Sequence, residues 1–196
     1  MSTREVIVPL NALPAPRDTL ARPVRDLRIS VMDRCNFRCP YCMPRETYHE
    51  QYRFLGSQER LSFDEIVRLA RLFVHLGVRK LRLTGGEPLL RANLPDLVGD
   101  LTTIPGVEDV ALTTNGVLLA DQIDALKSAG LGRITVSLDT LRPDRFTKLT
   151  RFDKLDAVHA GITAAHRVYD RLKIDTVVIR GVNDDELVDL VEYGKS

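Results

Sequence analysis

Three cysteines lie close together in this chain, at Cys35, Cys39 and Cys42. Their spacing is C-x3-C-x2-C, and the sequence has no other cysteine. Each iron of a cubane iron–sulfur cluster is normally held by one thiolate, so three cysteines leave one iron with an open coordination position. The spacing therefore predicts a four-iron cluster at which a small molecule binds and reacts.

Other interpretations of the three cysteines stay open at this point. A structural zinc ion could use His49 as its fourth ligand, although such sites usually combine two well-separated ligand pairs. Disulfides fit less well, because the number of cysteines is odd and 28% of the residues are charged. The thiols could also be ordinary buried side chains, but Asn36, Arg38 and Pro40 stand between them and favour a loop.

The composition predicts one domain. The chain has 196 residues, 44% of them hydrophobic, which is enough for one sizeable core. Its 28 basic and 27 acidic residues nearly cancel, so we expect no general attraction to nucleic acid or to a membrane. Residues 1–25 are polar, punctuated by proline and unlike a signal peptide, and we interpret them as an N-terminal arm before a domain over 26–196. This pattern indicates the cytoplasm.

Strand-like alternation and helical periodicity follow one another five times along the chain. Strands are predicted from residue 26 and over 80–84, 109–114, 133–139 and 172–179. Helices are predicted over 62–77, 93–101, 121–129 and 155–169, with helical turns from 143 and a last helix from 183. Ser62 with Glu65, and Asn183 with Glu186, have the spacing of a capping box. The predicted apolar face of the first helix consists of Ile66, Leu69, Ala70 and Phe73.

Strands that alternate with helices form a parallel sheet, in which strands that follow one another in sequence lie side by side. Ligands of such sheets bind at the carboxyl ends of the strands. The first predicted strand runs into the cysteines, and the next three end in the polar segments 84–88, 113–116 and 137–139. We therefore expect the chemistry at one rim of the sheet, although Asn115-Gly116 taken alone could be a simple turn.

The cysteine motif, with Tyr41 just before its last cysteine, resembles the signature of the radical S-adenosylmethionine (SAM) superfamily. Gly85-Gly86-Glu87-Pro88 resembles the glycine motif of the same superfamily. The resemblance implies a 4Fe–4S cluster on the three cysteines, with SAM on the open iron, where it is cleaved to a 5′-deoxyadenosyl radical. It also implies that Gly86 and Ser137 contact SAM and that Tyr41 lies at its adenine. The implied fold is α/β, a partial (β/α)6-type barrel with about five βα units, lacking the sixth strand and the C-terminal region.

Longer segments are similar to one family within that superfamily, the GTP 3′,8-cyclases of molybdenum cofactor biosynthesis. They occur in order between residues 26 and 190, at 26–30, 42–44, 81–91, 112–116, 136–139 and 173–184. The resemblance implies a lyase that cyclises GTP to (8S)-3′,8-cyclo-7,8-dihydroguanosine 5′-triphosphate and takes electrons from a donor. It further implies that GTP contacts Arg28, Arg82, Thr113 and Lys173.

Arginine suits a triphosphate because its planar donor fork matches phosphate oxygens. We expect Arg28 and Arg82 on strands, on faces that otherwise carry apolar residues, where an arginine without an anion is costly. The alternative is an outward, solvated position. The family is longer and carries a second three-cysteine cluster for the guanine end of GTP, and Asp175 stands where it usually has asparagine. The sequence therefore predicts cluster and SAM binding here, and complete GTP cyclisation only together with the missing part.

Two other functions compete with this prediction. The chain could be another radical SAM enzyme that modifies a peptide or RNA, or an inactive metal-binding remnant. Arg28 and Arg82 favour GTP, since a peptide substrate does not need two cations beside the cluster. A sheet without its sixth strand leaves an open edge, so a homodimer is expected to be one way of covering it.

Overall fold

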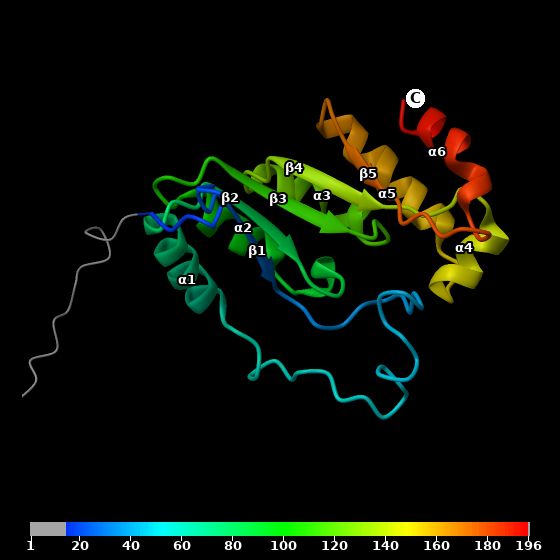
Figure 1. The fold of residues 1–196 in the computed structure, drawn as a ribbon, viewed down its shortest axis with the longest axis horizontal. Coiled ribbons are helices and arrows are strands. Elements are labelled where there is room, and N and C mark those ends of the chain that lie inside the picture. The colour runs from blue at the N-terminus through cyan, green and yellow to red at the C-terminus, as the bar shows by residue number, and fades with distance from the viewer. Residues whose placement is uncertain (1–14, 196) are drawn as a thin grey trace, which may run out of the picture.

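The computed structural model describes residues 15–195 and shows five strands with helices between them (Figure 1). The strands are β1 (Asp26–Ser30), β2 (Lys80–Thr84), β3 (Asp109–Thr114), β4 (Arg133–Ser137) and β5 (Lys173–Asp175). The α-helices are α1 (Phe63–His75), α2 (Leu94–Thr102), α3 (Leu119–Ser128), α4 (Pro143–Thr150), α5 (Leu155–Val168) and α6 (Leu187–Tyr193). Short 3₁₀ turns are η2 (Pro88–Leu90) and η3 (Asp184–Glu186).

The five strands form one parallel sheet in the order β1-β2-β3-β4-β5, as predicted. The predicted bounds of β2 and β3 are confirmed. Because every strand points the same way, all carboxyl ends meet at one edge. The prediction of an α/β fold that forms part of a barrel is confirmed, and the long segment between β1 and α1 loops out beyond this edge (Figure 1).

The face of the sheet that meets the helices is apolar. Leu81, Leu83, Leu112 and Val136 are fully buried there and belong to one core cluster with residues of the helices. The predicted apolar face of the second helix is confirmed in α2, at Leu94, Leu97, Val98 and Leu101. This packing fixes the sheet against a single helical layer, which leaves its other face free to line a site.

The apolar face predicted for the first helix is only partly right. The Ser62–Glu65 capping box is present and begins α1 as predicted. Leu69 and Phe73, however, are 40% and 36% exposed, while Val67 and Val74 are buried instead. Apolar side chains stand on two sides of this helix, and a sequence pattern cannot tell which side meets the sheet.

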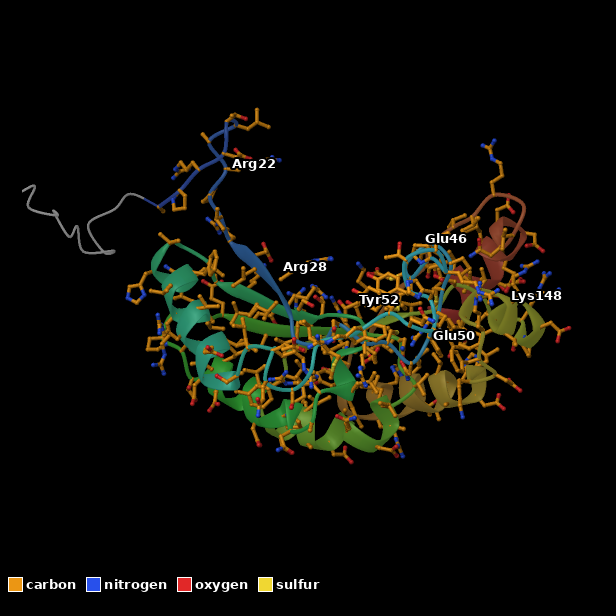
Figure 2. All side chains as sticks on the ribbon, turned by 90° about the horizontal axis from the view of Figure 1, so that it is seen from below. Arg22, Arg28, Glu46, Glu50, Tyr52 and Lys148 are labelled. Atoms are coloured by element: carbon orange, nitrogen blue, oxygen red, sulfur yellow. The ribbon has the colours of Figure 1, made fainter. Side chains whose placement is uncertain are left out.

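The other face of the sheet is mostly polar. The strand register places Arg28 beside Arg82, and Thr113 beside Thr135. Arg28 projects from the side that no helix covers (Figure 2). The expectation that the two arginines share a face with apolar residues is therefore wrong, since Ala111 is the main apolar neighbour there. An arginine on this face avoids the cost of an apolar surrounding.

Strand β5 is shorter than predicted. It leaves the ladder after Asp175, where the Thr176 hydroxyl donates to Leu138 O at 2.7 Å and Val177 N donates to Asp139 Oδ1 at 2.8 Å. Val177 and Val178 lie half-exposed beyond it. Hydrogen bonds that each involve one side chain thus replace the backbone ladder beyond Asp175, which a β-branched run in the sequence does not reveal.

The capping box predicted at Asn183 and Glu186 is wrong. The Asn183 side chain instead accepts from Ile179 N at 2.7 Å and donates to Asp139 O at 2.7 Å. Glu186 is fully buried and accepts from the Thr140 hydroxyl at 2.6 Å. Both side chains therefore tie η3 to the end of β4 rather than to its own helix.

Replacing Glu186 by glutamine is expected to destabilise the fold by about 2 kcal/mol at pH 7, since charge-assisted hydrogen bonds are lost. Its carboxylate also accepts from Leu141 N at 2.9 Å and is paired with Arg145. Burial opposes ionisation, but these donors outweigh it and hold the pKa of Glu186 below its ordinary value of 4.5. The stability that the Glu186 carboxylate contributes is therefore fully present above about pH 4.5, the ordinary pKa, and is lost as the pH falls through the lowered pKa of the folded state. Urea unfolding of both proteins at pH 7 and in acid tests this, and an equal difference at the two pH values would contradict it.

Of the predicted N-terminal arm, residues 1–14 lie outside the described residues. Residues 15–25 make a turn in which Arg17 and Pro23 form an antiparallel bridge, and Asp18 accepts from Arg22 N at 3.0 Å. Within residues 15–195, no helix is long and apolar enough to cross a membrane.

Candidate functional site

A cavity of about 570 Å³ lies at the carboxyl ends of the strands. Its walls come from the ends of β2, β3, β4 and β5 and from the loop that carries Cys35, Cys39 and Cys42, which we call the cysteine loop. The predicted site residues that line it are Arg28, Cys35, Cys39, Tyr41, Cys42, Gly86, Thr113 and Ser137. Two predicted residues, Arg82 and Lys173, do not line it. The structure thus brings eight of the ten together, from segments up to about a hundred residues apart in sequence.

The cysteine loop is fixed by its own backbone and by one aromatic anchor. Cys42 N and Met43 N both donate to Cys39 O, at 3.0 and 2.8 Å, so one tight turn carries the last two cysteines. Phe37 is buried and packs edge-to-face on Phe146, with 5.5 Å between the ring centroids. The first half of the loop is therefore anchored in the core.

The three thiols influence one another electrostatically. The pKa of Cys39 is raised to about 12, first by burial and then by the charges of Asp139, Cys35 and Cys42. Burial likewise raises the pKa of Cys35. All three cysteines are free. Metal binding at such thiols releases protons, because the thiolate is the ligand.

The donor set suits a cluster better than a zinc ion. In the described part of the chain, no three His, Cys, Asp or Glu side chains are grouped closely enough to hold one metal ion. His49 is exposed and does not line the cavity. The ligands of a cubane bind different irons and so lie farther apart than the ligands of one ion. Three soft thiols spread around one cavity therefore fit a 4Fe–4S cluster.

The two glycines after β2 lie against the chain that leads into the cysteines. Gly86 N donates to Met32 O at 2.6 Å, and Glu87 N donates to Arg34 O at 2.7 Å. A Cβ on Gly86 would stand 2.1 Å from Arg34 O, and one on Gly85 would stand 2.2 Å from Met32 O. Glycine is required here because two backbones meet, a tertiary contact that the GGEP motif alone does not reveal.

Tyr41 is linked to the end of β4. Its hydroxyl donates to Asp139 Oδ2, two residues beyond Ser137. Burial and the Asp139 carboxylate raise the pKa of Tyr41, so the phenol stays protonated and keeps donating. This contact holds the last part of the cysteine loop beside the β4 rim.

Arg82 and Lys173 have different surroundings. Arg82 Nη1 donates to the hydroxyls of Thr113 and Thr135, at 3.1 Å each, so it lies directly beneath a residue that lines the cavity. Lys173 is exposed and its Nζ lies 2.7 Å from Asp175 Oδ1. Arg82 is therefore adjacent to the site, whereas Lys173 is turned toward a carboxylate.

A buried network behind Cys35 was missed by the sequence analysis. Glu87 is fully buried and accepts from the Thr114 hydroxyl at 2.7 Å and from Asn115 N at 2.8 Å. The Asn115 amide Nδ2 then lies 2.6 Å from Asn36 Oδ1 and 3.7 Å from Cys35 Sγ. In the sequence, a glutamate after two glycines could equally cap a helix, and Asn115-Gly116 could be a simple turn. The one signal for this network was that Glu87 and Asn115 both follow predicted strands.

Comparisons with known proteins agree with this geometry. Residues 29–194 match the family model of the Radical SAM superfamily. The chain is 54% identical over 181 residues to the GTP 3′,8-cyclase of Acidothermus cellulolyticus, covering 91% of this chain and 50% of that protein. It is 48% identical over 192 residues to GTP 3′,8-cyclase 1 of Mycobacterium tuberculosis, covering 93% and 52%. The chain therefore spans about half the length of the curated relatives it matches.

Solved structures share the fold at low sequence identity. Methylornithine synthase (PylB) superposes with a TM-score of 0.65 at 18% identity, covering 88% of this chain and 50% of that one. The anSMEcpe structure with bound AdoMet gives a TM-score of 0.61 at 17% identity, covering 88% and 48%. A family match over most of the chain, with a cysteine-lined cavity at the rim of a partial barrel, shows that this chain belongs to the radical SAM superfamily, whose enzymes use a 4Fe–4S cluster and SAM.

Proposed function

We propose that residues 26–196 are the cluster- and SAM-binding core of a GTP 3′,8-cyclase that acts in molybdenum cofactor biosynthesis. The observation that carries this proposal is 54% identity over 91% of the chain to a protein of that name. The cyclic product, (8S)-3′,8-cyclo-7,8-dihydroguanosine 5′-triphosphate, would need the second cluster that this sequence lacks. The arm over 1–25 stands outside this core.

Cys35, Cys39 and Cys42 would hold the cluster, which supplies one electron for the reductive cleavage of SAM when it is bound. We assign the Gly86 backbone and Ser137 to SAM, because both line the cavity beside the thiols. Tyr41 would lie at the adenine, in an orientation that Asp139 fixes through the phenol.

Arg28, Arg82 and Thr113 would receive the GTP phosphates on the polar face of the sheet. Arg28 and Arg82 are register partners on neighbouring strands, and Arg82 already donates to Thr113. Hydrogen bonds to charged groups are worth about 1.5 to 3 kcal/mol each, so two such arginines would favour a triphosphate ligand. Lys173 would join them once the triphosphate competes with Asp175 for its ammonium group.

The remaining parts of the proposal concern partners and location. An electron donor is needed because the reductive cleavage of SAM consumes one electron from the cluster. The half-exposed valines beyond the short β5 give the sheet an apolar edge, which a second copy could cover in a homodimer. Three free cysteines at a cluster site favour the reducing cytoplasm.

Anaerobic reconstitution with iron and sulfide tests the core of the proposal. We expect about four irons per chain, absorbance near roughly 400 nm, and formation of 5′-deoxyadenosine from SAM with dithionite. The variant Cys39→Ala should stay folded by circular dichroism and lose all three signals. A folded parent chain that takes up no iron would contradict the proposal, and a cluster without SAM cleavage would favour an inactive remnant.

GTP binding separates a cyclase from other radical SAM enzymes. Arg28→Ala and Arg82→Ala should each weaken GTP binding in calorimetry by roughly 10- to 100-fold, the equivalent of one lost charge-assisted contact. Arg171→Ala is the matched control, since Arg171 is exposed between α5 and β5. Equal affinities in all three variants would count against GTP as the substrate.

Replacing Asn115 by alanine is expected to lower the midpoint potential of the reconstituted cluster by about 20 to 60 mV, the equivalent of one ordinary hydrogen bond. Asn115 Nδ2 lies 3.7 Å from Cys35 Sγ, and an N–H donor at a ligand sulfur stabilises the more negative, reduced cluster. A redox titration followed by electron paramagnetic resonance measures the shift. An unchanged potential at unchanged iron content would show that Asn115 only supports the loop.

A further inference from the structure

A second cavity, of about 1280 Å³, meets the 570 Å³ cavity at Cys35 but is otherwise lined by different residues. It is formed by the entry to the cysteines, the segment before α1 and the residues after η2. Within residues 15–195, Cys35 is the residue that lines both cavities. We call the second cavity the arginine cavity, because four arginines line it: Arg34, Arg38, Arg60 and Arg91.

These arginines have no carboxylate partner among the described residues. Arg91 Nη2 donates to Leu61 O at 2.7 Å, and Arg60 Nη1 donates to Met32 Sδ at 2.9 Å, so these groups bond to backbone or sulfur. Burial lowers the pKa of Arg91, and the nearby charge of Arg60 lowers it further. Only Asp64 and Glu65 oppose them in the lining. Four arginines against two carboxylates leave the lining with a net positive charge, which an anionic partner would complement.

Aromatic rings hold the guanidinium groups in place. The Arg34 and Arg38 Cζ atoms each lie 5.6 Å from the centroid of the Phe54 ring. Arg91 Cζ lies 5.1 Å from the centroid of Phe63. Arginine and aromatic residues are the types enriched in protein–protein interfaces, where ordered side chains lose less entropy on binding. The surface therefore has the composition of a protein–protein interface.

The arginine cavity also reaches the proposed cluster directly. Arg38 Nη1 donates to Phe37 O at 2.7 Å and also to Cys35 O. SAM and GTP are assigned to the other cavity, which Arg28 and Gly86 line. A partner in the arginine cavity can thus approach Cys35 without meeting either small molecule.

We propose that the arginine cavity is the docking surface for a small acidic one-electron carrier protein, which delivers its electron to the cluster at Cys35. The carrier is oxidised by one electron and the cluster is reduced by one electron. This inference rests on the proposed function, because it names the partner surface of the same cluster. A weak, electrostatically guided contact suits a carrier that must leave after each transfer.

The test uses the reconstituted full chain with reduced flavodoxin as the probe. The variant Arg34→Gln/Arg60→Gln removes two charges, and Arg171→Gln removes one exposed charge elsewhere. We expect the double variant to bind flavodoxin about tenfold more weakly at low salt, with the difference vanishing at high salt as screening removes the steering. Flavodoxin-driven SAM cleavage should fall to a similar extent, while dithionite-driven cleavage and iron content stay as in the parent.

Flavodoxin affinity that is unchanged in the double variant, or that ignores salt, would overturn the proposal. An equal loss of SAM cleavage with flavodoxin and with dithionite would also overturn it, because the arginines would then act on the cluster itself. If the parent cleaves no SAM with either reductant, the proposed function fails. The binding titration still decides the docking surface in that case, since it needs no turnover.

Discussion

Gly86→Ala is expected to lose most of its cluster and to destabilise the fold by roughly 3 kcal/mol or more, at the upper end of overpacking costs. The new Cβ would stand 2.1 Å from Arg34 O and 2.4 Å from Arg34 C, which are backbone atoms that no side-chain rotation can move. This clash is relieved only if the turn at Gly86 moves away from the segment around Arg34 that leads into the cysteines. That separation breaks the bonds from Gly86 N to Met32 O and from Glu87 N to Arg34 O.

Gly99→Ala provides the matched control for this prediction. Gly99 lies inside α2, and nothing stands within 4 Å of its added Cβ. Alanine there should be neutral or stabilise by up to about 1 kcal/mol through helix propensity. Iron per chain and urea unfolding are measured for both variants. Full iron content in Gly86→Ala would show that the close approach of the two backbones does not position the cysteines.

Glu87→Ala is expected to cost about 3 to 5 kcal/mol, because a buried acceptor is removed while its donors stay buried. Glu87 accepts from the Thr114 hydroxyl, Asn115 N and Leu89 N, so three donors from two segments lose their partner. The Asn115 amide beside Cys35 should then lose its fixed position. Unfolding in urea measures the loss of stability, and cluster content reports the effect on the cysteine loop.

Glu87→Gln gives the matched comparison and a pH dependence. Burial raises the pKa of Glu87 above its ordinary value of 4.5, against the opposing effect of its hydrogen bonds from Asn115, Leu89 and Thr114. A raised carboxyl pKa means that the folded state holds the proton more tightly, so this stability is present at low pH and lost as the pH rises. The advantage of the parent over Glu87→Gln should therefore narrow from pH 4 toward about pH 7. An advantage that grows with pH would show that the hydrogen bonds outweigh burial.

The order of the elements and the position of the chemistry follow from the amino-acid sequence. Five alternations of strand and helix can only form a parallel sheet in which the strand ends meet, so the cysteines, Gly86 and Ser137 had to lie at one rim. The sequence pattern was sufficient for features that depend on interactions between residues close together in the chain. The Ser62 cap of α1 and the bounds of β2 and β3 are of this kind.

Tertiary structure alone decided which partner each polar side chain takes. Asn183 and Glu186 have capping spacing but bond to the end of β4, and Lys173 pairs with Asp175, which lines the cavity where Lys173 does not. Glu87 is buried only because β3 lies beside β2 and supplies its donors. Such partners lie far apart in sequence. The residues around a carboxylate show the same pattern whether it caps a helix or belongs to a buried network, so the periodicity of the sequence cannot distinguish these two outcomes.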